Sequence, residues 1–336
     1  MFIPIPVEYH NMLKLNSLQY AKSNDLEISN KYSVSALKSN KSFDDLCLQY
    51  YSKFHYKCLK TFSFSKEGFL GLLLELKGKI AVSVGETQFL IDGAKMYESL
   101  GFEIQWVRLN KDGTINLYDL QNQDIDFLFL SSYVMDTFLQ IDLERIQKFT
   151  KAKIISNGTA HRSDQSNSVY FDNYKLNGFN VSGVLLFNDD MFDLLPIGQI
   201  DTIALKMCFL GLEKQQVNCQ IKNILIEELC KLFSEDIHLF VDKEKTLPNS
   251  LHFGLKGIKA RELIRTMALS KIYISNGEGC SLGLSKPSRI IQEMGYAEEM
   301  SRTAISLSFI DDITKDDIIN FTKVLYLKYQ QIKMLS

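Results

Sequence analysis

Between residues 79 and 187, short apolar runs alternate with amphipathic segments, and this alternation restricts the fold more than any other feature of the chain. The apolar runs have the length and composition of buried strands. They are residues 79–84, 102–109, 126–131, 152–156, 168–171 and 182–187. Residues 88–101 and 142–151, which lie between strands, have the pattern of helices. Short strands that alternate with helices indicate an α/β protein with a mostly parallel, doubly wound sheet.

Small or polar residues follow several of these predicted strands. In a doubly wound sheet, ligands bind beyond the carboxyl ends of the strands, so these positions are candidates for a site. They are Gly85, Glu86, Thr87, Ser131, Ser132, Asn157, Gly158, Asn173, Tyr174 and Lys175. Because polar residues end most strands, a purely structural interpretation of the same residues stays open.

Beyond residue 200 the pattern changes, which indicates a second domain of the α+β class. Residues 200–233 have the pattern of one long amphipathic helix or of two. The strands and helices predicted after them are strands at 247–255, 271–275 and 302–309 and helices at 259–269, 287–295 and 315–336. Thr314 and Asp317 have the spacing of a capping box at the start of the last helix. We therefore predict three segments, which are a divergent N-terminal segment at 1–60, a large α/β domain at 61–215 and a small α+β domain at 216–336.

Composition excludes several classes of function. The formal net charge of −2 gives no reason to expect nucleic acid or an anionic membrane as a partner. The sequence begins without a secretory signal pattern and holds no apolar run of about 18 residues, so we expect a cytoplasmic protein. The six cysteines show neither CxxC spacing nor a cluster with histidine, so no metal site is expected.

One cysteine has unusual neighbours. Cys280 lies in YISNGEGCSLGLSKPSRIIQEMG, residues 273–295, among glycines and small polar residues. A strand is predicted before it and a helix that opens with proline after it. Gly277, Gly279 and Gly283 would give this loop backbone freedom. Cys280 is therefore a candidate reactive thiol, although a small apolar filler is the alternative.

The order of these elements resembles the carboxyl-terminal domain of cysteine desulfurases, which belong to the class V aminotransferase group of fold-type I pyridoxal phosphate (PLP) enzymes. The resemblance rests on LPNSLHFGL, the helix after it, the Cys280 loop, and the Lys-Pro-Ser that opens the next helix. Two upstream stretches also resemble the family, namely residues 85–121 and FDNYKLNGFNVSGVLLF at 171–187. The likeness covers roughly residues 60–336 and implies a fold of this type.

The resemblance implies a role for two residues. Lys175 stands at the position of the lysine that holds PLP as a Schiff base. Cys280 stands at the position of the thiol that takes sulfur from the substrate as a persulfide. A solvated loop lysine and a remnant thiol on an inherited loop are the respective alternatives.

Other positions depart from the family pattern. Asn157 replaces the aspartate that pairs with the pyridine nitrogen, and Thr87 replaces the histidine that stacks on the ring. Ala160 replaces a glutamine that bonds the ring oxygen. Ser306 replaces the arginine that binds the substrate carboxylate, and serine cannot form a charged two-pronged contact. Thr202 is the candidate survivor of a phosphate-binding threonine.

Two hypotheses follow. The chain is either a cysteine desulfurase-like enzyme with PLP on Lys175 and a Cys280 persulfide, or a catalytically degraded homologue that serves as a partner or scaffold. The resemblance favours the first and the departures favour the second. Under both hypotheses the resemblance implies a homodimer, or a heterodimer with a related subunit. It also implies a sulfur-acceptor protein as a partner.

Overall fold

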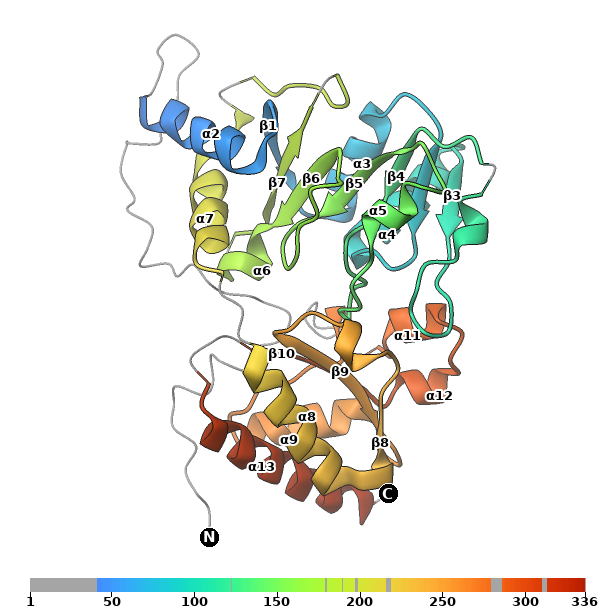
Figure 1. The fold of residues 1–336 in the computed structure, drawn as a ribbon, viewed down its shortest axis with the longest axis vertical. Helices are drawn as coiled ribbons and strands as arrows, with labels where there is room; N and C mark the ends of the chain where they lie inside the picture. The colour runs from blue at the N-terminus through green and yellow to red at the C-terminus, as the bar shows by residue number, and fades with distance from the viewer. Residues whose placement is uncertain are drawn as a thin grey trace.

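The computed structural model describes residues 41–121, 123–178, 180–188, 190–196, 199–215, 219–278, 286–309 and 313–335. Within these residues the chain forms two parts, which lie one above the other in Figure 1. The larger part is built on a seven-stranded sheet and the smaller part on a three-stranded sheet. The predicted α/β class is confirmed.

The large sheet has the strand order β1-β7-β6-β5-β4-β2-β3. Its strands are β1 (Cys58–Ser63), β2 (Ile80–Ser83), β3 (Ile104–Val107), β4 (Phe127–Phe129), β5 (Lys153–Asn157), β6 (Ser168–Asp172) and β7 (Ser182–Phe187). Strands β2 to β6 pair in parallel, whereas β7 pairs antiparallel with both β6 and β1. All six strands predicted in this region are present.

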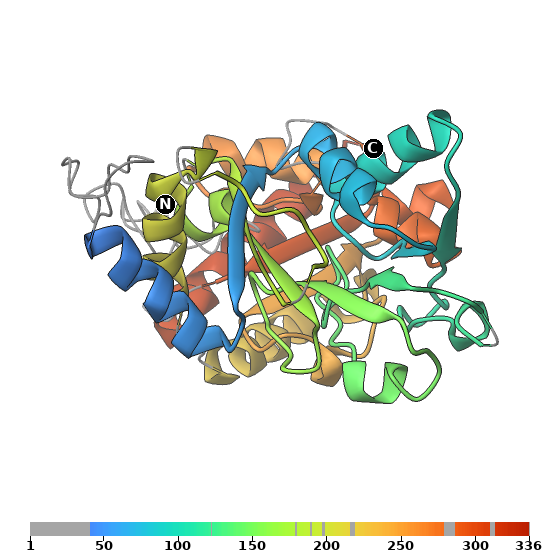
Figure 2. The same cartoon turned by 90° about the horizontal axis from the view of Figure 1, so that it is seen from above.

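Alternating side chains of the sheet enter two different cores, as the period of a strand requires. In β7, Val184 and Leu186 pack with α2 and α7, whereas Leu185 and Phe187 face the core that α3 and α4 cover. The bounds of these helices are α2 (Lys41–Phe54), α3 (Lys66–Glu75), α4 (Gln88–Ser99) and α7 (Thr202–Glu213). Figure 2 shows α2 and the α3–α4 pair on opposite sides of β1. The strands in the middle of the sheet are buried along most of their length.

The predicted N-terminal segment includes α2, which packs closely on the large part. The hydroxyl of Tyr50 donates a hydrogen bond of 2.6 Å to the carbonyl oxygen of Leu205 in α7, and the Tyr50 ring contacts Phe209 edge-on. Tyr50 is fully buried. The division of the chain at residues 60 and 215 stays a prediction.

The smaller part packs three helices on an antiparallel sheet of order β10-β9-β8. The strands are β8 (Ile237–His238), β9 (Ser250–Leu255) and β10 (Ala304–Ser308), and the helices that share its core are α8 (Cys219–Phe233), α9 (Ala260–Leu269) and α13 (Lys315–Lys333). The predicted capping box at Thr314 is confirmed, because its side chain and that of Asp317 each accept the other's backbone N–H. This arrangement agrees with the predicted α+β character.

The strand predicted at 271–275 is wrong. This segment makes a single bridge, between Ser275 and Ser306 of β10. Its apolar residues Ile272 and Ile274 are buried in the core of the smaller part, which explains the strand-like pattern. The chain then turns away at Gly277, whose φ is +116°.

Short elements complete the described fold. The remaining α-helices are α5 (Leu143–Ile146), α6 (Asn173–Asn177), α11 (Arg289–Glu293) and α12 (Glu298–Ser301), and the 3-10 helices are η3 (Leu117–Asp119), η5 (Ser234–Asp236) and η6 (Lys243–Lys245). Within the described ranges, none of the helices is both long and apolar enough to span a membrane.

Helix α13 offers a matched test of the smaller core. Leu325 is fully buried, whereas Leu327, two residues further along the same helix, is 61% exposed. We expect Leu325→Ala to lower the free energy of unfolding by about 2–5 kcal/mol, because the truncation leaves a cavity. Leu327→Ala should change it by less than about 0.5 kcal/mol. Urea unfolding of both variants checks this, and equal midpoints would contradict the packing described here.

Candidate active site

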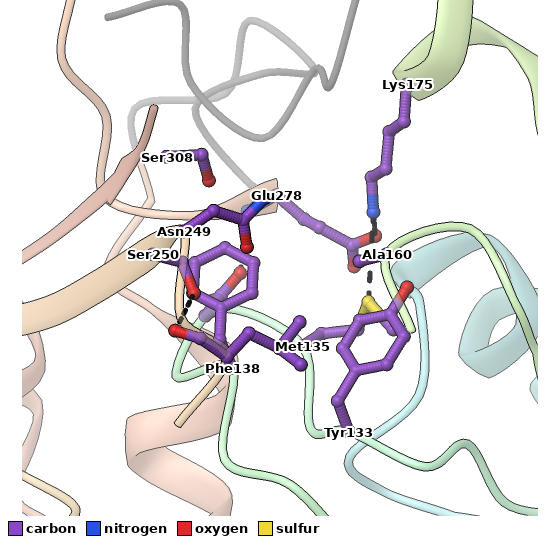
Figure 3. Close-up of a pocket in the computed structure, with 11 residues that line it drawn as sticks. Tyr133, Met135, Phe138, Ala160, Lys175, Asn249, Ser250, Glu278 and Ser308 are labelled. Atoms are coloured by element: carbon purple, nitrogen blue, oxygen red, sulfur yellow. Dashed lines mark hydrogen bonds and ion pairs between the residues drawn. The ribbon is translucent and has the colours of Figure 1, made fainter. Parts of the chain in front are cut away.

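A cavity of about 20 Å³ lies between the two parts of the molecule. Figure 3 shows side chains from both parts around it. Those from the larger part include Tyr133, Met135, Asp136, Phe138, Ala160 and Lys175, and those from the smaller part include Leu247, Asn249, Ser250, Glu278 and Ser308. A space of this volume holds about one water molecule. The side chains therefore fill most of the room between the two parts.

Lys175 points into this site from α6, directly after β6. The carboxylate of Asp172 caps α6 by accepting the backbone N–H of Lys175, and Gly178 ends the helix at φ +81°. The Lys175 Nζ lies 3.0 Å from Oε1 of Glu278 and 3.9 Å from Oδ2 of Asp172. Burial works to lower the pKa of Lys175, but the charges of Glu278 and Asp172 outweigh it and raise the pKa above its usual value. The two carboxylates therefore favour the ammonium form of Lys175.

The carboxylate of Glu278 contacts groups of the larger part at two places, the N-terminus of α4 and α6. Besides Lys175, its carboxylate accepts hydrogen bonds of 2.7 Å from the hydroxyl of Thr87 and from the backbone N–H of Gln88. These two donors form the N-terminus of α4, which favours negative charge. Burial works to raise the pKa of Glu278, but Lys175 and these donors outweigh it and hold the pKa below its usual value. Glu278 and Lys175 thus form a buried ion pair between the two parts.

Asp136 holds the backbone that carries Glu278. It has a positive φ of 60°, and its carboxylate accepts the N–H of Glu278 at 2.7 Å and the hydroxyl of Ser288 at 2.8 Å. Burial and the nearby charge of Glu278 raise the pKa of Asp136 to about 6. A Cβ on Gly277 would lie 2.2 Å from Cγ of Asp136, so this close approach requires glycine.

Ser306 supports the same assembly. Its hydroxyl donates a 2.9 Å hydrogen bond to the backbone carbonyl of Asp136, and its backbone N–H donates to Ser275. Ser306 is fully buried. The hydroxyl predicted to face the substrate therefore has a partner inside the protein, and its role toward a substrate stays a prediction.

Asn157 ends β5 with one side-chain group unpaired. Its Oδ1 accepts the backbone N–H of Thr159 at 2.9 Å, and its own backbone N–H donates to the hydroxyl of Ser131. Within the residues that the structure describes, the Nδ2 of Asn157 is buried and has no hydrogen-bond partner. An unpaired buried donor is costly, and a hydrogen-bond acceptor placed beside it would remove that cost.

A second buried carboxylate lies behind Thr87. Glu86 accepts hydrogen bonds from the backbone N–H and hydroxyl of Ser131 and from the hydroxyl of Tyr170. Burial raises its pKa, and these hydrogen bonds only partly oppose the shift. Arg289 of α11 donates to the backbone carbonyls of Val84 and Glu86, so the smaller part is anchored at the turn that carries Thr87.

The structure brings only some of the predicted site residues together. Lys175 and Thr87 meet through Glu278, and Asn157 is linked to them through Thr159, whose hydroxyl accepts the N–H of Asp172. Thr202 is the first residue of α7 and does not line the described cavity. Cys280 lies outside the described residues, and Glu278 is the last described residue before it.

The strand, helix and family patterns of the sequence do not single out Glu278 and Asp136, two acidic residues that many of the described contacts of the site involve. Glu278 stands out as the single charged residue in SNGEGCSLGLS, residues 275–285. A charge among small loop residues is a usable signal. Among the described residues, no group of three or more histidine, cysteine, aspartate or glutamate side chains could hold a metal ion.

Comparisons with curated proteins point to one group of relatives. No family model matches the chain. Cysteine desulfurase IscS of Buchnera aphidicola subsp. Acyrthosiphon pisum (strain 5A) is 26% identical over 117 residues, which cover 35% of this chain and 28% of that protein. The chain thus matches less than a third of the length of that relative. Cysteine desulfurase IscS of Rickettsia peacockii (strain Rustic) is 21% identical over 300 residues, which cover 77% of this chain and 71% of that protein.

Solved structures show the same fold. A protein described as NifS-like superposes with a TM-score of 0.69 at 13% identity, and covers 98% of this chain and 97% of its own. A NifS-like protein from Rickettsia africae ESF-5 gives a TM-score of 0.69 at 16% identity, with 91% and 93% covered. A phosphoserine aminotransferase from Cytophaga hutchinsonii gives 0.62 at 12% identity, with 88% and 91% covered. In sequence the chain is thus similar to cysteine desulfurases at 21–26% identity, and in fold it is similar to NifS-like proteins and to a phosphoserine aminotransferase.

Proposed function

We propose that the chain is a cysteine desulfurase-like PLP-dependent protein, with Lys175 as the cofactor lysine and Cys280 as the thiol that takes the sulfur. One observation carries the proposal. The buried amine of Lys175 lies beyond the carboxyl end of β6 and contacts Glu278, only two residues before Cys280. The segment that leads to Cys280 in the sequence therefore starts beside Lys175, which supports a transfer of sulfur to Cys280 from a substrate held at Lys175.

The residues of the site fit PLP in chemical character. The unpaired Nδ2 of Asn157 is a donor for the pyridine nitrogen, which is an acceptor when unprotonated. The hydroxyl of Thr87 and the N–H of Gln88 already hold a carboxylate, so they are competent to bind an anionic group. The space for the cofactor is filled by the Glu278 side chain in this structure, so Glu278 has to move for PLP to enter.

When bound, PLP supplies an electron sink for bond cleavage next to the substrate amine. Asn157 would orient the ring through its nitrogen but cannot hold a proton there by charge, because an amide is neutral. Lys175 would anchor the cofactor and move a proton at its Nζ. Cys280 would attack the substrate sulfur as a thiolate. We therefore expect the cofactor to be a weaker electron sink with Asn157 at the ring nitrogen than it would be with an aspartate there.

Substrate binding is the weakest part of the site. The hydroxyl of Ser306 is bound to the carbonyl of Asp136, so it has little capacity for a substrate carboxylate. Serine also lacks the charged fork of an arginine. We expect cysteine to bind with low affinity. We also propose a dimeric, cytoplasmic protein that passes sulfur to an acceptor protein, which is supported by the family resemblance.

The cofactor itself can be tested by absorption. We expect the purified protein, incubated with PLP, to develop a visible absorption band that persists after gel filtration. Lys175→Ala should lose the band, because it removes the amine that binds the cofactor covalently. Lys77→Ala, at an exposed lysine that does not line the cavity, is the matched control and should keep it. A wild-type protein that shows no visible band after incubation with PLP would contradict the proposal.

The sulfur transfer can be tested separately. We expect the PLP-loaded protein to release sulfide from cysteine in the presence of a reductant, and Cys280→Ser to lower the rate by at least about 100-fold, as loss of a nucleophile does. Cys230→Ser changes an exposed cysteine of α8 and should leave the rate unchanged. Equal rates in both variants would rule out Cys280 as the acceptor. Sulfide release from none of the proteins would support the non-catalytic alternative.

Asn157→Asp tests the orientation of the ring nitrogen. The new carboxylate oxygen would take the place of the unpaired Nδ2, buried and without a donor. We expect the cofactor-free variant to lose about 1–3 kcal/mol of stability, because an unsatisfied buried group is costly. Added PLP should raise the melting temperature of the variant more than that of the wild type, since a protonated pyridine nitrogen would pair with the carboxylate. Equal shifts would contradict this placement.

A further inference from the structure

The carboxylate of Glu278 occupies the place where a ligand would be expected. It lies 3.0 Å from Nζ of Lys175 and 2.7 Å from the hydroxyl of Thr87, and it accepts the N–H of Gln88. The free space that remains beside it is about 20 Å³. Figure 3 shows the Glu278 carboxylate beside the Lys175 amine in this space. A single protein side chain thus engages both the lysine and the anion-binding end of α4.

We propose that Glu278 is a built-in occupant of the lysine pocket. Its carboxylate pairs with Lys175 and fills the N-terminus of α4, so that a carbonyl compound reaches the Lys175 amine only by displacing it. The identity of the cofactor as PLP rests on the proposed function. The pairing of Glu278 with Lys175 is a contact within the chain and does not depend on that function.

The placement of Glu278 is built into the fold rather than a chance rotamer. Its backbone N–H donates to Asp136, and the same carboxylate of Asp136 accepts the hydroxyl of Ser288 at the start of α11. Gly277 allows the chain to pass within contact of Asp136. These contacts fix the backbone of Glu278 at the pocket, independently of the ion pair that its side chain makes with Lys175.

Charged groups from several elements face this pair. Lys175 comes from α6, Asp172 from the end of β6, Glu86 from the turn before α4, and Asp136 from the segment after β4. All of these carboxylates repel Glu278, and Lys175 is the cation that its carboxylate contacts among the described residues. Lys175 therefore offsets only part of the negative charge that these four carboxylates bring to the pocket.

The chemical consequence is a barrier to reaction at Lys175. To bond a carbonyl carbon, the ammonium must first give a proton to Glu278 or to water. The nitrogen lone pair then forms the C–N bond, and the carbonyl oxygen leaves as water. A paired carboxylate opposes the first step, because it stabilises the ammonium over the amine.

The pairing can be tested without any cofactor. Reductive methylation with formaldehyde and cyanoborohydride, followed by peptide mass spectrometry, measures the reactivity of Lys175 as a function of pH. We expect Glu278→Gln and Glu278→Ser to methylate Lys175 about tenfold faster than the wild type, as a fall of one unit in the lysine pKa would do. Their pH profiles should also shift to lower pH, which a purely structural change would not cause.

Matched controls keep this test decisive. Glu298 is an exposed glutamate at the start of α12 that pairs with Arg302, the residue after the helix. The Glu298→Gln variant loses this charge and should methylate Lys175 at the wild-type rate. Glu278→Gln keeps the size and the acceptor for Thr87, so it carries the test if Glu278→Ser fails to fold by circular dichroism. Methylation of Lys175 at equal rates in the wild type and Glu278→Gln would overturn the inference.

Titration of the same four proteins with PLP separates this inference from the proposed function. We expect both Glu278 variants to reach half-saturation at about tenfold lower PLP concentration, because the competing carboxylate is gone. Faster methylation with no cofactor band in any protein would uphold the pairing and refute the proposed function. Equal half-saturation and equal methylation in all four would uphold the proposed function and refute the role of Glu278.

Discussion

The buried ion pair between Lys175 and Glu278 is the interaction on which the arrangement of the site depends. Both side chains are nearly removed from water, with 13% and 11% of their surfaces exposed. Removing two charges from water costs several kcal/mol per ion, and mutual attraction offsets this only when further hydrogen bonds complete the geometry. Thr87 and Gln88 supply those hydrogen bonds to Glu278. The pair also joins the two parts of the molecule, so the position of one part on the other is coupled to the charge of the site.

The supporting contacts follow from this pair in a defined order. Ser306 of β10 holds the carbonyl of Asp136, and the carboxylate of Asp136 holds the backbone of Glu278. The residue that stands in place of the substrate-binding arginine is thus part of the support for Glu278. A longer, charged side chain at position 306 would have no room in a fully buried strand that already contacts Asp136. Ser306 and Glu278 are therefore linked through Asp136, which both of them contact.

Much of the fold could be predicted from the sequence, because its main signals are local. The apolar runs of the large sheet and the capping box at Thr314 are each defined by a few adjacent residues. Residues 271–275 were misassigned because Ile272 and Ile274 are buried against helices, which produces the alternation of a strand without a pairing partner along most of its length. Burial alone does not distinguish these two situations.

The site was less predictable, because its contacts join residues that are distant in the sequence. Glu278 meets Lys175 across 103 positions and Thr87 across 191. The resemblance to a family identified Lys175, Thr87 and Asn157 by position, but it could not identify a group that the family pattern does not contain. The sequence shows that Glu278 is a charged residue within a loop of small residues, but it does not show that Glu278 contacts Lys175 and Thr87.

The charge of Lys175 accounts for the position of Glu278. Asn157 and Ser306 are neutral, so neither of them can act as a counter-ion for the buried Lys175. A buried unpaired ammonium would be strongly disfavoured. Glu278 and Asp172 supply the opposing charge. Any anionic cofactor therefore has to compete with a carboxylate that the chain already holds in place.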